Sequence, residues 1–310
     1  MATNVLVTGA AGFIGSHLCT RLATQQGIHV TGIDDLRSGS GSRIPEQVNH
    51  MNRDISEISV AEWTELLTDV DIVYHLAAEK YNASKSSPER LLLTNVNATE
   101  RLARAAALAN VGRVVFTSSL YSYGSMGPKT MDEKDVPEPS TLYGASKLMG
   151  EGILRSVDRE LGLSWNVARL FFIYGPWQFA HGGYKSVIIK NFERALRGES
   201  MQINGSGNQA LDYIYVDDCV EALIALATSN KDHKVVNVAS GVGTAIRDLV
   251  TVMSSIAGCG LNDLEHAPAD WTEGSRRVGA PSEIERYVGW RATTSIELGL
   301  ERVWNWISNK

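Results

Sequence analysis

The sequence of 310 residues contains only three cysteines, and none of its apolar runs approaches the ~20 residues that a membrane-spanning helix needs. Cys19, Cys219 and Cys259 are far apart and lack metal-ligand spacing, so we expect buried thiols in a reducing compartment and no metal site. Residues 1–4 lead directly into an apolar strand, without the basic and long apolar regions of a secretory signal. We therefore expect a cytoplasmic protein without membrane contact.

The chain also lacks an excess of positive charge. It has 29 Lys and Arg against 35 Asp and Glu, a formal net charge of −6 at pH 7, so we expect no nucleic-acid partner. Hydrophobic residues make up 44% and charged residues 21%, which is typical of a globular protein. At this length the expected organisation is one large domain with a smaller second domain.

Short apolar strands alternate with helical stretches through the first half of the chain. The predicted strands are residues 5–7, 29–33, 71–76, 113–117 and 164–170, and the predicted helices are residues 13–25, 60–67, 88–109 and 143–161. This alternation predicts an α/β fold, a Rossmann-type doubly wound parallel sheet with helices on both faces.

Three glycines, Gly9, Gly12 and Gly15, lie where the first strand leads into the helix that begins at Phe13. The first allows a tight turn, the second lets backbone N–H groups approach a pyrophosphate, and the third allows close packing of helix on strand. The second strand is followed by Asp34, whose carboxylate can bind ribose hydroxyls. We therefore predict a dinucleotide site, and NAD rather than NADP, because Asp34 would repel a 2′-phosphate.

A tyrosine and a lysine, Tyr143 and Lys147, are spaced to lie on one face of a helix. An ammonium beside a phenol stabilises the phenolate and lowers its pKa, which makes Tyr143 a candidate general acid/base for a carbinol/ketone pair. Ser119 ends a predicted strand, and ligands of an open α/β sheet bind where strands end. We therefore predict that Ser119, Tyr143 and Lys147 form the catalytic set.

Together these motifs resemble the extended short-chain dehydrogenases/reductases, the NAD-dependent sugar epimerase/dehydratase family. The resemblance covers nearly the whole chain, and it rests on GxxGxxG at residues 9–15, Asp54-Ile55, His75-Leu76-Ala77-Ala78, Ser118-Ser119 before Tyr123-Gly124, YxxxK at residues 143–147, Arg169 with Tyr174-Gly175-Pro176, and residues 213–218. It implies a sheet domain for NAD at residues 1–175, with a return around 213–239, and a smaller C-terminal domain, mainly substrate-binding, at residues 176–310.

The resemblance also implies a role for individual residues. Ser119 would hydrogen-bond the reacting hydroxyl, Tyr143 would exchange its proton, and Lys147 would hold the nicotinamide ribose. The implied cofactor-binding residues are Gly9, Gly12, Phe13, Ile14, Gly15, Asp34, Asp54, Ile55, Leu76, Ala77, Ala78, Lys80, Asn95, Tyr143 and Lys147.

Three polar residues near the implied site also have simpler interpretations. Asn95 could equally be a polar residue on a helix face, and His75 a hydrogen-bonded core histidine. Arg37 lies close enough to Asp34 to weaken the preference for NAD, but its simpler interpretation is a solvated loop cation.

The substrate side departs from the family pattern. Leu120 and Tyr121 occupy the positions where the family's 4,6-dehydratases carry an Asp–Glu pair, so we do not expect standard dehydration. Phe172 and Leu211 replace an Asn and an Arg that grip a substrate diphosphate, and a further Arg position falls near Asp270. An apolar side chain there compensates an anion poorly, so the sequence does not predict an ordinary UDP-sugar grip. Four cations could substitute from elsewhere, although such residues are mostly solvated at the surface: Arg276, Arg277, Lys185 and Lys190.

Two enzyme functions follow from these observations. The first is an epimerase acting on a sugar or nucleotide-sugar through a transient ketone. The alternative is a dehydrogenase or ketoreductase, NAD- or NADP-dependent, acting on a sugar, cyclitol or other small alcohol without a nucleotide. Phe172, Leu211 and the aromatic residues Trp177, Phe179 and Tyr184 favour the alternative, although the aromatic residues also suit a domain interface.

A dinucleotide-sensing protein without activity would be expected to lose Tyr143 or Lys147, and both are present. Family members often pair through two helices that correspond here to residues 88–109 and 143–161. A homodimer is therefore expected.

Overall fold

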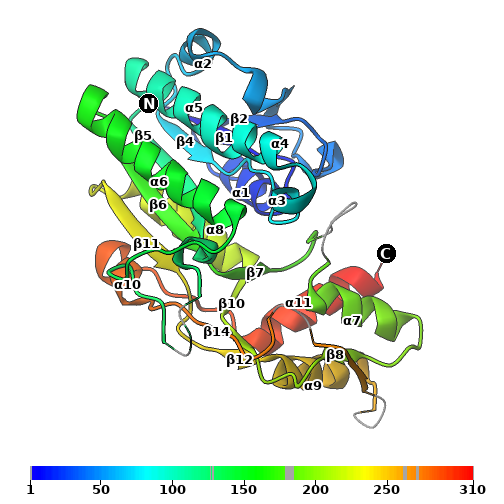
Figure 1. Ribbon diagram of the computed structural model, residues 1–310. Coiled ribbons are helices and arrows are strands. Elements are labelled where there is room, and N and C mark those ends of the chain that lie inside the picture. The colour runs from blue at the N-terminus through cyan, green and yellow to red at the C-terminus, as the bar shows by residue number, and fades with distance from the viewer. Residues whose placement is uncertain are drawn as a thin grey trace.

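The computed structural model describes residues 2–125, 127, 129–178, 185–260, 264–269 and 272–309. Phe179, Tyr184 and Asp270 lie outside the described residues. The main sheet has seven parallel strands in the order β11-β6-β5-β4-β1-β2-β3 (Figure 1). These strands are β1 (Thr3–Thr8), β2 (Ile28–Asp34), β3 (Asn49–Asn52), β4 (Ile72–His75), β5 (Arg113–Ser119), β6 (Trp165–Leu170) and β11 (Lys234–Val238).

Helices cover both faces of this sheet, which confirms the predicted fold class. On one face lie α2, α5 and α6, and on the other α1 and α8 (Figure 1). Their bounds are α1 (Phe13–Ala23), α2 (Val60–Leu66), α4 (Pro88–Leu92), the π-helical turn η3 (Leu93–Asn97), α5 (Ala98–Leu108), α6 (Leu142–Leu161) and α8 (Val216–Thr228).

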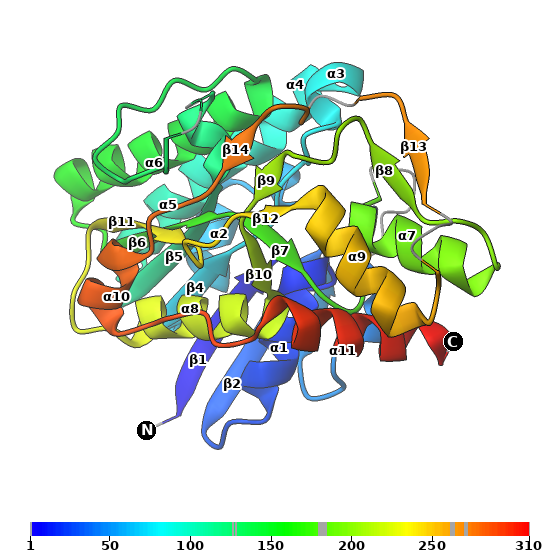
Figure 2. The same cartoon turned by 90° about the horizontal axis from the view of Figure 1, so that it is seen from below.

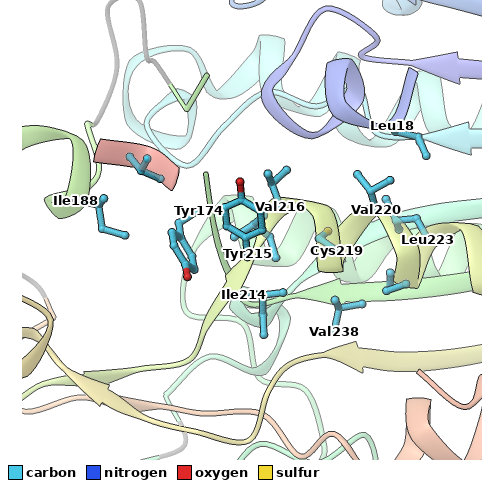
Figure 3. Packing of buried hydrophobic residues seen from close by; sticks show 14 of the residues in the cluster. Leu18, Tyr174, Ile188, Ile214, Tyr215, Val216, Cys219, Val220, Leu223 and Val238 are labelled. Atoms are coloured by element: carbon cyan, nitrogen blue, oxygen red, sulfur yellow. The ribbon is translucent and has the colours of Figure 1, made fainter. Parts of the chain in front are cut away.

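Side chains of β1 alternate between the two faces, as the period of a strand requires. Val5 and Val7 pack into the core beneath α1 and α8, whereas Leu6 packs beneath α2 and α5. Figure 3 shows the first core, where Leu18 of α1 and Val220 and Leu223 of α8 gather among apolar side chains. Burial on both faces explains why these strands read as nearly continuous apolar runs in the sequence.

Local signals set the ends of the helices. The Ser59 side chain accepts from the Glu62 N–H at the start of α2, and the Glu62 carboxylate accepts in return from the Ser59 N–H. Thr141 caps α6 in the same way, through the N–H of Gly144. The chain leaves α6 at Gly162, whose φ of 77° is the left-handed conformation that suits glycine.

A second group of elements lies beyond the ends of the sheet strands (Figures 1 and 2). Three helices pack on one another: α7 (Val187–Leu196), α9 (Ile246–Ala257) and α11 (Ile296–Ser308). Short strand pairs lie beside them: β7 (Phe172–Tyr174) with β10 (Tyr213–Tyr215), β8 (Gln202–Asn204) with β13 (Glu265–Ala267), and β9 (Ala210–Leu211) with β12 (Thr244–Ala245) and β14 (Arg276–Arg277).

The chain returns to the main sheet between these elements. Helix α8 packs on β5 and β6, and β11 then pairs with β6 from Lys234 to Val238. The short helix α10 (Ser282–Val288) packs against β11. Division of the chain at residue 175, with a return around 213–239, remains a prediction. In the described part of the chain, no helix is long and apolar enough to span a membrane.

Candidate active site

A cavity of about 430 Å³ opens where the parallel strands β1, β2, β4 and β5 end. Strand ends are the usual ligand position in an open parallel sheet. The cavity brings together most of the predicted site residues: Gly9, Gly12, Phe13, Ile14, Gly15, Asp34, Asp54, Ile55, Leu76, Ala77, Ala78, Lys80, Ser119, Tyr143, Lys147 and Phe172. Asn95 and Leu211 are not among the residues that line it.

The glycine loop needs its glycines for space and for backbone conformation. Gly9 has φ +75°, and a Cβ on it would lie 2.8 Å from the Ala77 nitrogen. A Cβ on Gly15 would lie 2.0 Å from the carbonyl oxygen of Gly9. No side chain caps α1 at Gly12, so the first N–H groups of this helix face a cavity that Phe13 and Ile14 line. This arrangement fits a pyrophosphate group.

Replacing Gly15 by alanine is expected to force α1 away from the loop, because the new methyl overlaps the Gly9 carbonyl. Overpacking of this kind lowers the free energy of unfolding by about 1–3 kcal/mol, and we expect weaker NAD binding as well. The matched control is Gly152→Ala in α6, where a Cβ meets nothing within 4 Å, and which should stabilise by about 0.5–1 kcal/mol. Urea unfolding and NAD titration of both variants test this, and equal effects would contradict it.

Asp34 is aimed at the cavity by two backbone hydrogen bonds. Its carboxylate accepts from the Ala11 N–H at 3.0 Å and from the Leu36 N–H at 2.8 Å. Burial raises the pKa of this carboxyl, although both hydrogen bonds act in the opposite direction. The side chain is thereby held at the end of β2 beside the glycine loop, which suits the hydroxyls of a ribose better than a 2′-phosphate.

Arg37 is an exposed loop cation, as its simpler interpretation expected, and it is also ion-paired. Its guanidinium donates to Asp54 at 2.6 Å and to Asp35 at 2.8 Å. Arg90 of α4 donates to the same Asp54 at 2.7 Å and to Glu79 at 3.2 Å. The network joins segments far apart in the sequence at the rim of the cavity. Because the Arg37 guanidinium is already paired with Asp35 and Asp54, it is not available to bind a 2′-phosphate.

Asn95 lies behind the cavity wall. Its side-chain amide donates to the Glu79 carbonyl at 3.1 Å and to Ser146 Oγ at 3.0 Å, and its oxygen accepts from the Glu79 N–H at 2.7 Å. Asn95 therefore positions the segment that carries Lys80, and it ties this segment to α6 next to Lys147. Direct contact between Asn95 and the cofactor remains a prediction.

Ser119, Tyr143 and Lys147 meet where β5 ends and α6 begins. Tyr143 and Lys147 stand one helical turn apart, and Ser119 lies near enough to Tyr143 to lower the pKa of its hydroxyl. Lys147 Nζ donates to the Thr117 carbonyl at 2.9 Å and lies 5.0 Å from the centre of the Phe116 ring. The three side chains face one cavity together with the glycine loop, which allows proton exchange beside a bound cofactor.

The pKa values of Tyr143 and Lys147 differ from what the sequence predicts. Burial raises the pKa of Tyr143, against the lowering effect of Ser119, so the phenol is protonated in this structure. Burial lowers the pKa of Lys147 to about 8. Lys147 Nζ donates to the Thr117 carbonyl and is itself desolvated, and the Tyr143 pKa is set by burial and by Ser119 rather than by this ammonium. The expected effect of Lys147 on Tyr143 is therefore not found here.

Lys147 should make stability depend on pH. Its pKa is about 8 in the folded protein, against an ordinary lysine pKa of 10.5 in the unfolded chain, so the unfolded chain binds more protons between these values. The free energy of unfolding of the cofactor-free protein should therefore gain up to about 3 kcal/mol from this group as pH rises through that window. Below the folded pKa the desolvation cost is present in full and constant.

The difference in unfolding free energy between wild type and Lys147→Met, measured against pH, isolates this contribution. It should change across the window and be flat below it, whereas the exposed Lys134→Met should give a flat difference throughout. A flat difference for Lys147→Met would contradict the assignment.

His75 has the structural role that was one of its two interpretations. Its ring lies between Thr8 Oγ1 at 2.8 Å and Thr99 Oγ1 at 2.9 Å, and it is fully buried. Burial lowers its pKa to about 3, so the ring is neutral and cannot serve as a proton carrier near neutral pH. It joins β1, β4 and α5 beneath the cavity.

A buried ion pair supports the catalytic strand from behind. Arg169 of β6 donates to both oxygens of Glu151 of α6, at 2.9 and 2.7 Å, and both side chains are at most 3% exposed. Ser118 Oγ donates to Glu151 at 2.6 Å, and the Arg169 guanidinium lies 4.5 Å from the centre of the Tyr123 ring. These contacts hold Ser118, directly before Ser119, and Tyr123, four residues after it.

The substrate end of the cavity is largely aromatic. Phe172 and Tyr121 line it, and the Tyr121 ring packs edge-on against Tyr143 with 5.7 Å between centres. Tyr81 lies on the other side, 5.4 Å from Tyr121. Leu211 is 5% exposed in β9 and lies in the core, so its predicted contact with substrate is not seen in the cavity lining.

A model of the NAD dependent epimerase/dehydratase family matches residues 5–239. The chain belongs to this family. The UDP-glucose 4-epimerase of Mycolicibacterium smegmatis is 32% identical over 311 residues, 98% of each chain. The structure of UDP-glucose 4-epimerase from Thermotoga maritima with UDP-glucose has a TM-score of 0.90 at 29% identity, over 99% of each chain.

A third relative was solved with both a cofactor and a sugar. It is the UDP-glucuronic acid 4-epimerase from Bacillus cereus with UDP-glucuronic acid and NAD, which has a TM-score of 0.88 at 25% identity and covers 99% of each chain. The resemblance noted in the sequence is thus confirmed. The cofactor of this NAD-dependent enzyme family is NAD, in agreement with the position of Asp34.

Proposed function

We propose that this protein is a nucleotide-sugar 4-epimerase that acts on a UDP-sugar. The observation that carries the proposal is a single cavity lined both by the glycine loop with Asp34 and by Ser119, Tyr143 and Lys147. The relatives named UDP-sugar 4-epimerases, matched over nearly their whole length, support the choice of substrate.

The residues present fit NAD. The Gly9–Gly15 loop leaves room for a pyrophosphate at the start of α1, and Asp34 is held where ribose hydroxyls would lie. Lys147 is placed one turn from Tyr143, where its ammonium can hold the second ribose. When bound, NAD supplies reversible hydride acceptance at the carbinol carbon, so that a ketone can stand between the two sugar epimers.

Residues of the protein transfer the proton of the reacting sugar hydroxyl. Ser119 holds the sugar hydroxyl, and Tyr143 takes the hydroxyl proton and later gives it back from the same oxygen. Because burial raises the Tyr143 pKa, the phenol must lose its proton before it acts as base, and Ser119 favours that loss. The aromatic end, with Phe172 and Tyr121, offers few polar partners to hold the sugar in one orientation, which suits a ring that must turn over.

A one-way dehydrogenase or ketoreductase is the second candidate, and Phe172 in the cavity wall favours it. An apolar side chain compensates a diphosphate poorly, so a substrate without a nucleotide would suit this wall.

Turnover distinguishes the two functions. The purified protein, without added cofactor, is incubated with UDP-glucose, UDP-N-acetylglucosamine and UDP-glucuronic acid, and the sugars are identified by NMR. An epimerase should convert at least one to its C4 epimer until equilibrium. Stoichiometric consumption of added NADH by a ketone, with no epimer from any of the three, would overturn the proposal in favour of the second candidate.

We also propose a homodimer formed by the helices α4–α6. Four of the exposed large apolar side chains among the described residues lie along this run, at Leu93, Leu108, Met149 and Leu161. Sedimentation should show a dimer, and the variant Leu108→Glu/Met149→Glu should shift it toward monomer, whereas Val136→Glu, which lies outside these helices and is even more exposed, should not. A monomeric wild type would contradict this. The cytoplasmic location remains a prediction.

A further inference from the structure

Strand β14 brings a charged side chain, that of Arg277, beside Tyr121, which lines the substrate end of the cavity, although Arg277 is not itself among the lining residues. It runs parallel to β9 (Figure 2), and Arg277 is paired with Leu211. The Arg277 carbonyl accepts from the Asp212 N–H at 3.1 Å, which fixes the register. Paired residues of parallel strands direct their side chains to the same face of the sheet, so the Arg277 side chain lies on the same face as that of Leu211.

Aromatic rings join Arg277 to the reacting residues. Its guanidinium carbon lies 5.4 Å from the centre of the Tyr121 ring, and Tyr121 in turn packs edge-on against Tyr143. A guanidinium stacked on an aromatic face is held in one plane while its N–H groups still point outward at the edge. Arg277 is half-buried, and burial lowers its pKa while the Tyr121 and Tyr81 hydroxyls raise it, so it keeps its charge.

The rest of this end of the cavity is poorly suited to an anion. Phe171, Phe172 and Tyr121 line it, and their rings cannot compensate a negative charge. A UDP-sugar carries a diphosphate, and a UDP-glucuronic acid carries a carboxylate in addition. Either group needs a donor of the forked, charged kind in a partly desolvated position.

We propose that Arg277, held against the Tyr121 ring, binds anionic oxygens of the substrate, either of its diphosphate or of a carboxylate on its sugar. The inference rests on the proposed function and deepens it, because it names a substrate-binding residue that lies outside the glycine loop and the Ser119–Tyr143–Lys147 set. It also gives the apolar cavity wall at Phe172 a compensating charge from β14.

Binding of non-reacting and reacting ligands tests the proposal. The NAD-loaded protein and Arg277→Gln are titrated calorimetrically with UDP, UDP-glucose and UDP-glucuronic acid. A charge-assisted contact predicts about 10- to 100-fold weaker binding in the variant. Weaker binding of all three ligands assigns the contact to the diphosphate, and weaker binding of UDP-glucuronic acid alone assigns it to the carboxylate.

Two further variants separate a specific contact of Arg277 from a general effect of removing positive charge. Arg276→Gln is the matched control, since Arg276 lies next in the same strand and donates to Thr130 Oγ1 at 3.0 Å. It should bind all three ligands like the wild type. Arg277→Lys, which keeps the charge but loses the fork, should fall between the wild type and Arg277→Gln. Retained NAD in each variant shows that the fold is intact.

Ligand affinities for Arg277→Gln within about twofold of the wild type, or an equal loss in Arg276→Gln, would overturn the inference while leaving the proposed function standing. If the wild type bound none of the three ligands, the proposed function itself would fail, and the inference with it.

Discussion

Replacing Tyr143 by phenylalanine is expected to lower kcat by about 10²- to 10⁴-fold, because a positioned proton carrier contributes a factor of this size. The variant loses one oxygen and keeps the ring, so the edge-on packing on Tyr121 should remain. Tyr143 is only partly buried and lines the cavity, so removing its hydroxyl should leave the fold intact. The measurement is steady-state conversion of a UDP-sugar, with bound NAD determined on the same preparation.

The matched control is Tyr287→Phe. Tyr287 lies in α10, away from the cavity, and its hydroxyl donates to Asn166 at 3.0 Å. It should lose some stability and keep its kcat. Wild-type turnover in Tyr143→Phe, or an equal loss in both variants, would show that Tyr143 does not carry the proton.

Removing one partner of the buried Arg169–Glu151 pair should have the largest effect on stability. Arg169→Met leaves the Glu151 carboxylate buried with Ser118 alone to offset it. Breaking a buried pair costs about 3–5 kcal/mol in the free energy of unfolding, because the remaining charge is uncompensated. Because Ser118 is adjacent to Ser119, we also expect kcat to fall with little change in NAD affinity. Urea unfolding at neutral pH measures the first effect.

Two further variants separate burial from pairing. The double variant Arg169→Met/Glu151→Leu should recover most of the loss, since no buried charge remains. Arg104→Met removes an exposed pair with Glu100, 37% and 40% exposed, and should cost about 0.5 kcal/mol or less. A small effect for Arg169→Met, or no recovery in the double variant, would contradict the account.

The cofactor end of the site could be predicted from the sequence because its signals are local. Gly9, Gly12 and Gly15 lie within seven residues where strand β1 leads into helix α1, and their spacing has few other uses. Tyr143 and Lys147 are neighbours through helix geometry alone. The order of strands and helices then places Ser119 and Asp34 at the same edge of a parallel sheet.

Other parts depend on contacts between distant segments. Arg37 and Arg90 meet Asp54 only because the ends of β2 and β3 and the start of α4 converge, which spacing in the sequence does not reveal. Strand β3 was missed because Asn49–Asn52 is polar, and it gains its place by pairing with β2 at the sheet edge. Arg277 comes beside Leu211 through a pairing of two-residue strands, too short to leave a pattern.

Retention of deuterium tests the central claim most directly. UDP-glucose with deuterium at C4 is converted in ordinary water by the protein as purified, without added NAD, and the product is examined by NMR. We expect UDP-galactose that keeps the deuterium at C4, because the hydrogen leaves and returns within one closed site while Tyr143 exchanges only the hydroxyl proton. Product with solvent hydrogen at C4, or no epimer from this or the other UDP-sugars, would contradict the proposed function.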